Sequence, residues 1–181
     1  MNQKPLTHNT RIAVACLLAI LSFFILVGID QFTKYLIIQN LELYDSIPLI
    51  PNIFEIHYIQ NEGAAWGILA NKQVLFCIIA ILFLILGFFV YFRCVQMNRF
   101  KALRAVLIFI LSGAMGNLID RISLHYVIDF LYIKAINFPV FNVADCYVTV
   151  GCVLMIILCT FYYPEQELDQ LFIKGKSRRG E

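Results

Sequence analysis

Charged residues are scarce in this chain of 181 residues: Asp, Glu, Lys and Arg together make up only 14% of it. A soluble domain carries roughly 25%. Hydrophobic residues account for 61% of the sequence, and the mean hydropathy is +0.79. This balance excludes an ordinary soluble domain and predicts an integral membrane protein with a single domain. The net charge of +2 is small and no basic cluster is interleaved with aromatic residues, so nucleic acid is not an expected partner.

Several motifs of familiar chemistry are also missing. The six cysteines form no CxxC pair and lie within or beside apolar runs, which is typical of small buried hydrophobic side chains rather than disulfides or metal ligands. The sequence contains no HExxH motif and no Ser-His-Asp spacing, and its three histidines are scattered. A zinc or serine mechanism therefore has little support, and we expect neither a metal nor a cofactor.

Long uncharged runs are what the chain has in abundance. They contain 18, 20, 15 and 19 residues, bounded in turn by Arg11 and Asp30, Lys72 and Arg93, Arg104 and Asp120, and Asp145 and Glu165. A helix needs roughly 20 residues to cross the hydrocarbon of a bilayer. We predict an all-α membrane protein with four transmembrane helices, at about residues 12–30, 73–92, 105–120 and 145–163. The third run is short, so Asp120 should lie near the membrane surface. No small-residue cleavage site follows the first run, which predicts a retained helix.

The basic residues are distributed asymmetrically around these runs. Ten of the 14 precede the first run, join the second to the third, or follow the fourth. The positive-inside rule then predicts that both termini are cytoplasmic, with a basic tail at 165–181. The connections 40–72 and 121–144 would lie on the extracytoplasmic side. They hold most of the carboxylates found between the first run and the last.

The first outer connection is too long for a plain turn. Pro48 and Pro51 predict irregular extended chain over Asp45–Pro51. Apolar and polar residues then alternate from Phe54 to Tyr58, which indicates a half-exposed strand, and Asn61-Glu62-Gly63 predicts a turn. We expect a small β element at the membrane surface.

Three aspartates lie on the connection between the third and fourth runs, and their neighbours differ. Asp120 precedes Arg121, which predicts an ionised, paired and structural carboxylate. Asp129 lies among Val, Ile and Phe, so desolvation should raise its pKa and favour the protonated form. Asp145 opens the last predicted helix, where backbone N–H groups and the helix dipole would favour its charged form.

Two carboxylates whose surroundings push their pKa values apart can work as an acid and a base. One would activate water while the other protonates, or hydrogen-bonds, the carbonyl under attack. On the residues alone, two simpler interpretations stay open: Asp145 as only a helix cap, and Asp129 as only a loop residue in a scaffolding protein. A small proton-coupled transporter is a further alternative. Such relays usually place acids within the spans, and we find no inverted repeat here.

Five short motifs follow one another along the chain, and together they carry a resemblance. They are DQFTK at 30–34, NEGAAWG at 61–67, GNLIDR at 116–121, VIDF at 127–130 and FNVAD at 141–145. In this order they resemble bacterial lipoprotein signal peptidases, the signal peptidase II family. The resemblance covers nearly the whole chain. Trp66 stands where the family often has Phe.

The resemblance implies an aspartyl endopeptidase that removes signal peptides from prolipoproteins by cleaving before a diacylglyceryl-modified lipobox cysteine. It implies Asp129 and Asp145 as the catalytic residues, without metal. It further implies supporting roles around the site for Asp30, Lys34, Asn61, Gly63, Trp66, Asn117, Asp120, Arg121 and Asn142.

The same resemblance places the protein in the bacterial cytoplasmic (inner) membrane as a multi-pass protein. Since a four-helix enzyme can have its own groove, we expect a monomer. Its active site would lie on the extracytoplasmic side, with the prolipoprotein substrate and membrane lipid as partners. We expect the loop that carries Trp66 to fold over the substrate like a clamp.

Overall fold

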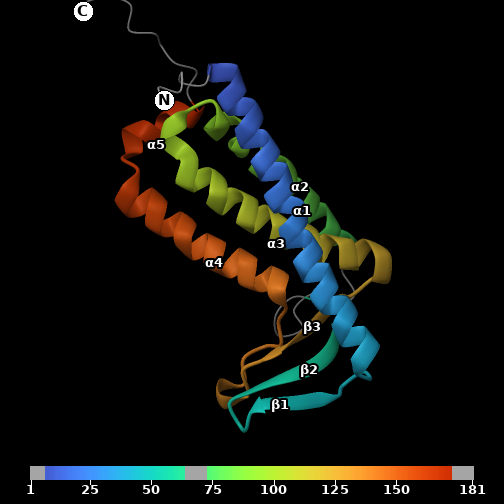
Figure 1. Cartoon of the computed structure of the whole chain (residues 1–181). Coiled ribbons are helices and arrows are strands. Elements are labelled where there is room, and N and C mark those ends of the chain that lie inside the picture. Colours follow the sequence, from blue (N-terminus) through green and yellow to red (C-terminus); the bar gives the residue numbers. More distant parts are fainter. Residues whose placement is uncertain (1–6, 64–72, 173–181) are drawn as a thin grey trace, which may run out of the picture.

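The computed structural model describes residues 7–63 and 73–172. Within these residues, four helices are long and apolar enough to cross a membrane, which confirms the predicted number (Figure 1). They are α1 (His8–Asn40), α2 (Gln73–Val95), α3 (Lys101–Leu124, preceded by a 3-10 turn at Asn98–Phe100) and α4 (Val143–Ile157, continued by a π-helical turn at Leu158–Tyr162).

Three of these helices run past the ends that the sequence predicted, α2 by only three residues and the other two by more. Helix α1 continues beyond Asp30 to Asn40, and α3 continues beyond Asp120 to Leu124. The predicted ends were set by the first charged residue of each run. Both aspartates are instead buried and share Lys34 as an ion-pair partner, so their charge does not end the helix.

Helix α3 is the centre of the bundle and packs against α1, α2 and α4. In its most apolar stretch 61% of the residues are buried, against 11–17% in the other three helices. Glycines allow the close approach: a Cβ on Gly113 would lie 2.4 Å from the carbonyl oxygen of Ala144 in α4. A Cβ on Gly116 would lie 2.4 Å from the carboxylate of Asp30 in α1. These contacts bring the start of α4 and the interior of α1 close to α3.

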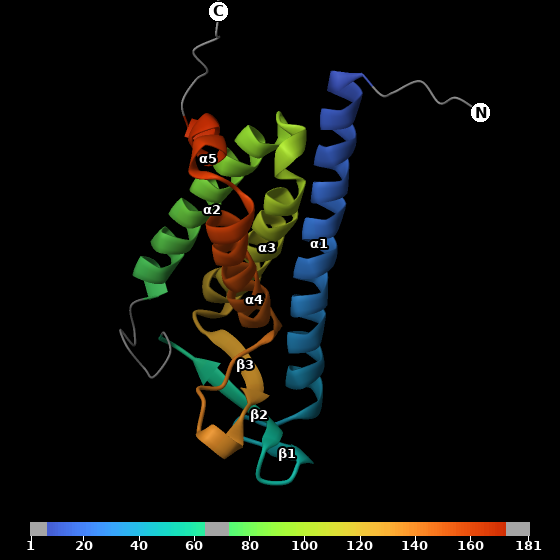
Figure 2. The same cartoon turned by 90° about the vertical axis from the view of Figure 1, so that its left-hand side faces the viewer.

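A three-stranded antiparallel sheet closes one end of the bundle (Figures 1 and 2). Its order is β1 (Ser46–Ile50), β2 (Phe54–Asn61) and β3 (Val127–Tyr132). The strand predicted from the alternation after Phe54 is confirmed. The chain over Asp45–Pro51 is extended, as predicted, but it is not irregular throughout: Ser46–Ile50 pairs with β2 as the edge strand, with a register shift between Pro48 and Ile50. An edge strand tolerates Pro48, whose missing N–H costs no ladder bond on the open side.

The faces of β2 are less regular than the alternation predicted. Glu55 is buried although it is charged, and its carboxylate pairs with Lys134 at 3.0 Å. Tyr58 is also buried and packs with Ile128 and Phe130 of β3. The strand ends in the predicted turn, where the backbone N–H of Gly63 donates to the side-chain oxygen of Asn61 at 3.0 Å.

At the other end of the bundle, the segment expected as a solvated tail begins with the short helix α5 (Glu165–Phe172) (Figure 2). Leu171 is buried, and its carbonyl accepts a hydrogen bond of 2.6 Å from Arg93 at the end of α2. Arg99 pairs with Glu167 at 2.9 Å and lies over the ring of Tyr162. The helix has one apolar face, which docks it on the bundle.

Candidate active site

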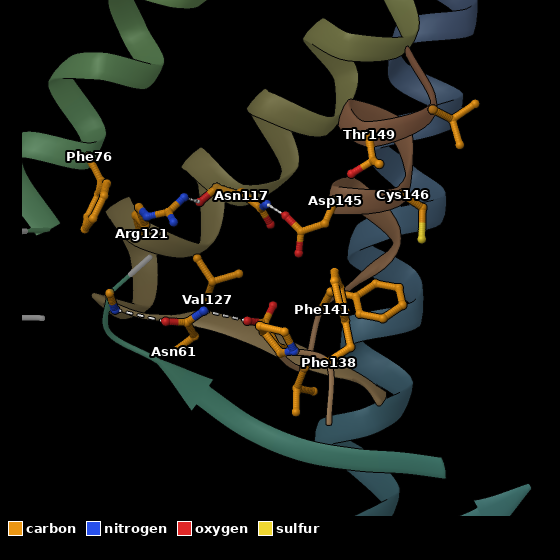
Figure 3. A pocket seen from close by; sticks show the side chains of 15 residues that line it. Asn61, Phe76, Asn117, Arg121, Val127, Phe138, Phe141, Asp145, Cys146 and Thr149 are labelled. Carbon is orange, nitrogen blue, oxygen red and sulfur yellow. Dashed lines mark hydrogen bonds between the residues drawn. The ribbon is translucent and has the colours of Figure 1, made fainter. Parts of the chain in front are cut away.

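A cavity of about 590 Å³ lies where the sheet meets the helices. Asp129 reaches it from β3 and Asp145 from the first turn of α4, so residues 16 positions apart in sequence line one space. Figure 3 shows Asn61, Asn117 and Asp145 around this cavity, with Arg121 beside them. The sheet supplies one wall and the ends of the helices supply the others.

Asp129 is 2% exposed and lies on β3 opposite Ile59 of β2. Its carboxylate accepts two hydrogen bonds of 2.7 Å, from the side-chain amides of Asn61 and Asn142. The pKa of Asp129 is raised to about 7 by burial first and by repulsion from Asp145 second, against the lowering effect of the two amide donors. The direction agrees with the prediction from its apolar neighbours, because desolvation is the largest cause.

Asp145 occupies the third position of α4 rather than the cap itself. Asn142 is the cap, and the two residues form a reciprocal capping box. The Asn142 side-chain oxygen accepts from the Asp145 N–H at 3.0 Å, and the Asp145 Oδ2 accepts from the Asn142 N–H at 3.1 Å. The other carboxylate oxygen accepts from the amide of Asn117 at 2.7 Å. Asp145 therefore accepts N–H donors on both oxygens, an arrangement that suits a carboxylate.

Asn142 holds both aspartates at once. Its side chain is fully buried, and its Nδ2 donates to Asp129 at 2.7 Å and to Asn117 at 2.9 Å. Its Oδ1 caps α4 at Asp145. One amide thus links the strand that carries Asp129 to the helix that carries Asp145.

Behind the cavity, the buried ammonium of Lys34 contacts three side chains. It lies 2.9 Å from the carboxylates of Asp30 and Asp120, and it donates to the side-chain oxygen of Asn117 at 2.9 Å. The Asp30 carboxylate also accepts from the N–H of Ala144, which ties α1 to the start of α4 at 2.9 Å. This cluster fixes α1, α3 and α4 relative to one another.

The predicted pairing of Asp120 with Arg121 is wrong, since Asp120 pairs with Lys34. Successive residues on a helix point about 100° apart, so neighbours in sequence face different surroundings. Asp120 turns inward to Lys34 and also accepts from the backbone N–H of Ile128 at 3.2 Å, next to Asp129. Asp120 is therefore a paired carboxylate, as expected, but its partner is Lys34 and not Arg121.

Arg121 instead lines the cavity. Its Nη1 donates to the carbonyl of Asn117 at 3.3 Å, and its guanidinium lies 5.2 Å from the ring centre of Phe76. Its Nε is buried and has no hydrogen-bond partner among the described residues. A cation with unused donor capacity therefore faces the same cavity as the two aspartates.

The structure brings most of the predicted site residues together. Those that line the cavity are Asn61, Gly63, Asn117, Arg121, Asp129 and Asp145. Those that support it from behind are Asp30, Lys34, Asp120 and Asn142. Trp66, and with it the predicted clamp, lies outside the described residues. In the described ranges 7–63 and 73–172, no three His, Cys, Asp or Glu side chains are grouped so as to hold a metal ion.

Sequence reasoning missed Gln31. Its amide donates to the carboxylate of Asp120 at 2.9 Å, to Asp30 at 3.2 Å and to the carbonyl of Gly116 at 3.1 Å. A signal for it existed, because it is an uncharged polar residue directly after Asp30 in an otherwise apolar helix. The apolar walls of the cavity, such as Phe138 and Phe141, were also not predicted.

Comparison with known proteins identifies the family. The model of the family described as signal peptidase (SPase) II, Peptidase_A8, matches residues 22–161. This chain belongs to the signal peptidase II family. It is thus an aspartic-type peptidase, and the alternative of a proton-coupled transporter has no support.

Curated relatives agree with the family match. The chain is 40% identical over 142 residues to the lipoprotein signal peptidases of Streptococcus pyogenes serotypes M5 and M18. The matches cover 77% of this chain and 91% of each relative.

Solved structures of bacterial membrane enzymes show the same fold. One, determined at 2.3 Å resolution, is 36% identical, with a TM-score of 0.71 over 81% of this chain and 92% of the other. A second, at 1.9 Å resolution, is also 36% identical, with a TM-score of 0.69 over 80% of this chain and 94% of the other.

Proposed function

We propose that Asp129 and Asp145 are the catalytic pair with which this signal peptidase II removes signal peptides from prolipoproteins. The scissile peptide bond would be the one before a diacylglyceryl-modified cysteine. The observation that carries the proposal is that these two carboxylates face one cavity and are linked by the single amide of Asn142. Their settings differ, as an acid and a base require.

The roles follow from those settings. With its pKa raised to about 7, Asp129 is the place where the pair keeps a proton, and Asp145, with N–H donors on both oxygens, is the carboxylate. Asp145 removes a proton from water as the water oxygen attacks the carbonyl carbon, and Asp129 gives its proton to the carbonyl oxygen. When the resulting diol collapses, Asp129 regains that proton. Asp145 passes the proton it took to the departing nitrogen.

The shape of the cavity fits a substrate that is apolar on both sides of the bond. Phe76 of α2 lines one side, Thr149 and Val150 of α4 line the opposite side, and Phe138 and Phe141 lie near the sheet. These walls can receive the hydrophobic segment of a signal peptide and the acyl chains on the cysteine. The guanidinium of Arg121 can donate to a carbonyl of the bound peptide.

The position of the site supports a location at a membrane surface. The cavity lies between the sheet and the ends of the helices, where water for hydrolysis and a membrane-held lipid can both reach it. We expect a multi-pass protein of the bacterial inner membrane, with cytoplasmic termini and the active site on the outer side. The cavity is formed by one chain, so we expect a monomer to be active.

The test is cleavage of a lipid-modified precursor peptide by the purified full chain, beside the same peptide without the lipid. Asp129→Asn and Asp145→Asn should each lower kcat by about 10²–10⁴-fold, because each removes a proton-transfer group and keeps the shape. Asp169→Asn, an exposed change of the same kind on α5, is the control. Full activity of either cavity variant would exclude the pair.

A further inference from the structure

A second polar cavity lies at the end of the bundle opposite the sheet. It measures about 420 Å³ and is bounded by the first turns of α1, the end of α2 and the start of α3. His8 and Arg11 line it from α1, and Lys101 and Arg104 line it from α3. No Asp or Glu is among the described residues that line it. The cavity therefore gathers basic groups without an acidic partner in its walls.

Two of the basic residues of this cavity, both on α3, have no carboxylate paired with them in the described part of the chain. Within the described part of the chain, neither Lys101 nor Arg104 forms a salt bridge. The nearest acidic helix, α5, uses Glu167 to pair with Arg99 instead. The first turn of α3 contains no acidic residue and its N-terminus has no side-chain cap, so the positive end of the helix dipole adds to the field.

The basic cavity adjoins a second, more apolar cavity between α1 and α3. This cavity, of about 330 Å³, shares Lys101 and Arg104 with the basic one and continues between α1 and α3 past Leu26. A third cavity, of about 210 Å³, meets the second at Ala19 and Tyr91 and has only apolar walls. The first two cavities adjoin each other, so a basic mouth has a more apolar continuation along α1 and α3. Figure 2 shows α1 running beside α3.

We infer that these cavities bind an anionic phospholipid. The phosphate lies among Arg11, Lys101 and Arg104, and the acyl chains lie in the apolar continuation along α1 and α3. A basic pocket between transmembrane helices is the kind of site that recognises anionic headgroups. A free phosphate would use only the mouth, whereas the apolar continuation matches a headgroup with chains attached. The site is at the other end of the molecule from the aspartates, so the inference does not depend on the proposed catalysis.

The charge in the mouth can be tested by lipid retention. The full chain is placed in nanodiscs containing equal phosphatidylglycerol and phosphatidylcholine with the same acyl chains, and the lipid retained after release is measured by native mass spectrometry. Wild type should prefer phosphatidylglycerol. Each basic group near an anionic headgroup contributes about a fivefold preference for the anionic lipid. The double variant Lys101→Gln with Arg104→Gln should therefore reduce that preference about 30-fold. Lys101→Arg with Arg104→Lys keeps the charge and should keep the preference.

Two controls separate a built site from general attraction to a basic end. Arg104→Gln should weaken the preference about fivefold. Arg99→Gln, the same change at the same end but outside the three cavities, should keep it. Ala19→Phe keeps every charge but fills the apolar continuation, so it should also lower retention. Equal retention of both lipids by wild type, equal losses in the two arginine variants, or displacement by millimolar inorganic phosphate would overturn the inference.

Discussion

Lys34 donates to the side-chain oxygen of Asn117 at 2.9 Å, and this contact decides which way the amide faces. With its oxygen turned to the ammonium, Asn117 can only present its NH₂ group to Asp145, at 2.7 Å. A cation buried in α1 thus controls a hydrogen bond to the candidate catalytic carboxylate without touching it.

Lys34→Met should destabilise the protein strongly. It would leave Asp30 and Asp120 buried without their cation, and breaking a buried pair typically costs about 3–5 kcal/mol. Thermal unfolding in detergent would show a lower Tm than wild type. Adding Asp120→Asn should recover part of the loss, because one of the two stranded charges is then removed. A Tm unchanged by Lys34→Met alone would mean that the cluster is not ionised as a unit.

Activity should fall as pH rises through the range where the pair loses its proton. The pKa of Asp129 is raised to about 7, chiefly by burial, so the alkaline limb of kcat/KM should lie near that pH. Asn61→Ala removes a donor that favours the charged form, so this limb should move to higher pH. A limb that stayed in place or moved to lower pH would contradict the role given to Asp129.

The raised pKa of Asp129 also predicts how the stability of the folded protein changes with pH. Because the folded pKa of about 7 lies above the ordinary 3.8, the folded protein keeps a proton that the unfolded chain releases across this range. The contribution of Asp129 to stability is therefore least favourable above pH 7, and it improves as pH falls toward 4. The Asn side chain of Asp129→Asn does not titrate. The Tm of this variant minus the Tm of wild type should therefore be more positive at pH 8 than at pH 5.

Gly116→Ala should damage the site from within α3. Its Cβ would lie 2.4 Å from the Asp30 carboxylate, which would have to shift away from Lys34 and Ala144. Overpacking of this kind costs about 1–3 kcal/mol, and we expect reduced peptidase activity with it. Gly28→Ala, with open space around it on α1, is the matched control and should leave activity and Tm nearly unchanged.

Local pattern predicted the elements better than their contacts. The four apolar runs gave the number of spanning helices, and the alternation after Phe54 gave the central strand of the sheet. The helix ends were missed because a charge was taken to stop a span. Asp30, Lys34 and Asp120 remain inside the bundle because Lys34 pairs with Asp30 one turn away in α1 and with Asp120 across the helices, in α3. That kind of pairing has no signature within either segment alone.

For the candidate site, too, local properties were predictable from the sequence and contacts between segments were not. The apolar neighbours of Asp129 were enough to predict a raised pKa, since burial is a local property of that stretch. The partner of Asp120 was not predictable from its neighbour Arg121, because helix geometry turns the two side chains to different sides. Pro48 was assigned to irregular chain since sequence alone does not say which strand lies at an edge.

The shared ammonium in α1 also bears on how the chain assembles in a bilayer. Within α1 the charges of Lys34 and Asp30 cancel, because the two residues are one turn apart and already paired. Asp120 of α3 follows about 90 residues later in the chain. Its carboxylate can form its buried ion pair only when Lys34 of α1 is already in the membrane. We expect α3 to settle stably only once α1 is in place. If the chain is divided between α2 and α3 and the two halves are co-expressed, both halves should accumulate in the membrane. The half that carries α3 should be degraded when it is expressed alone.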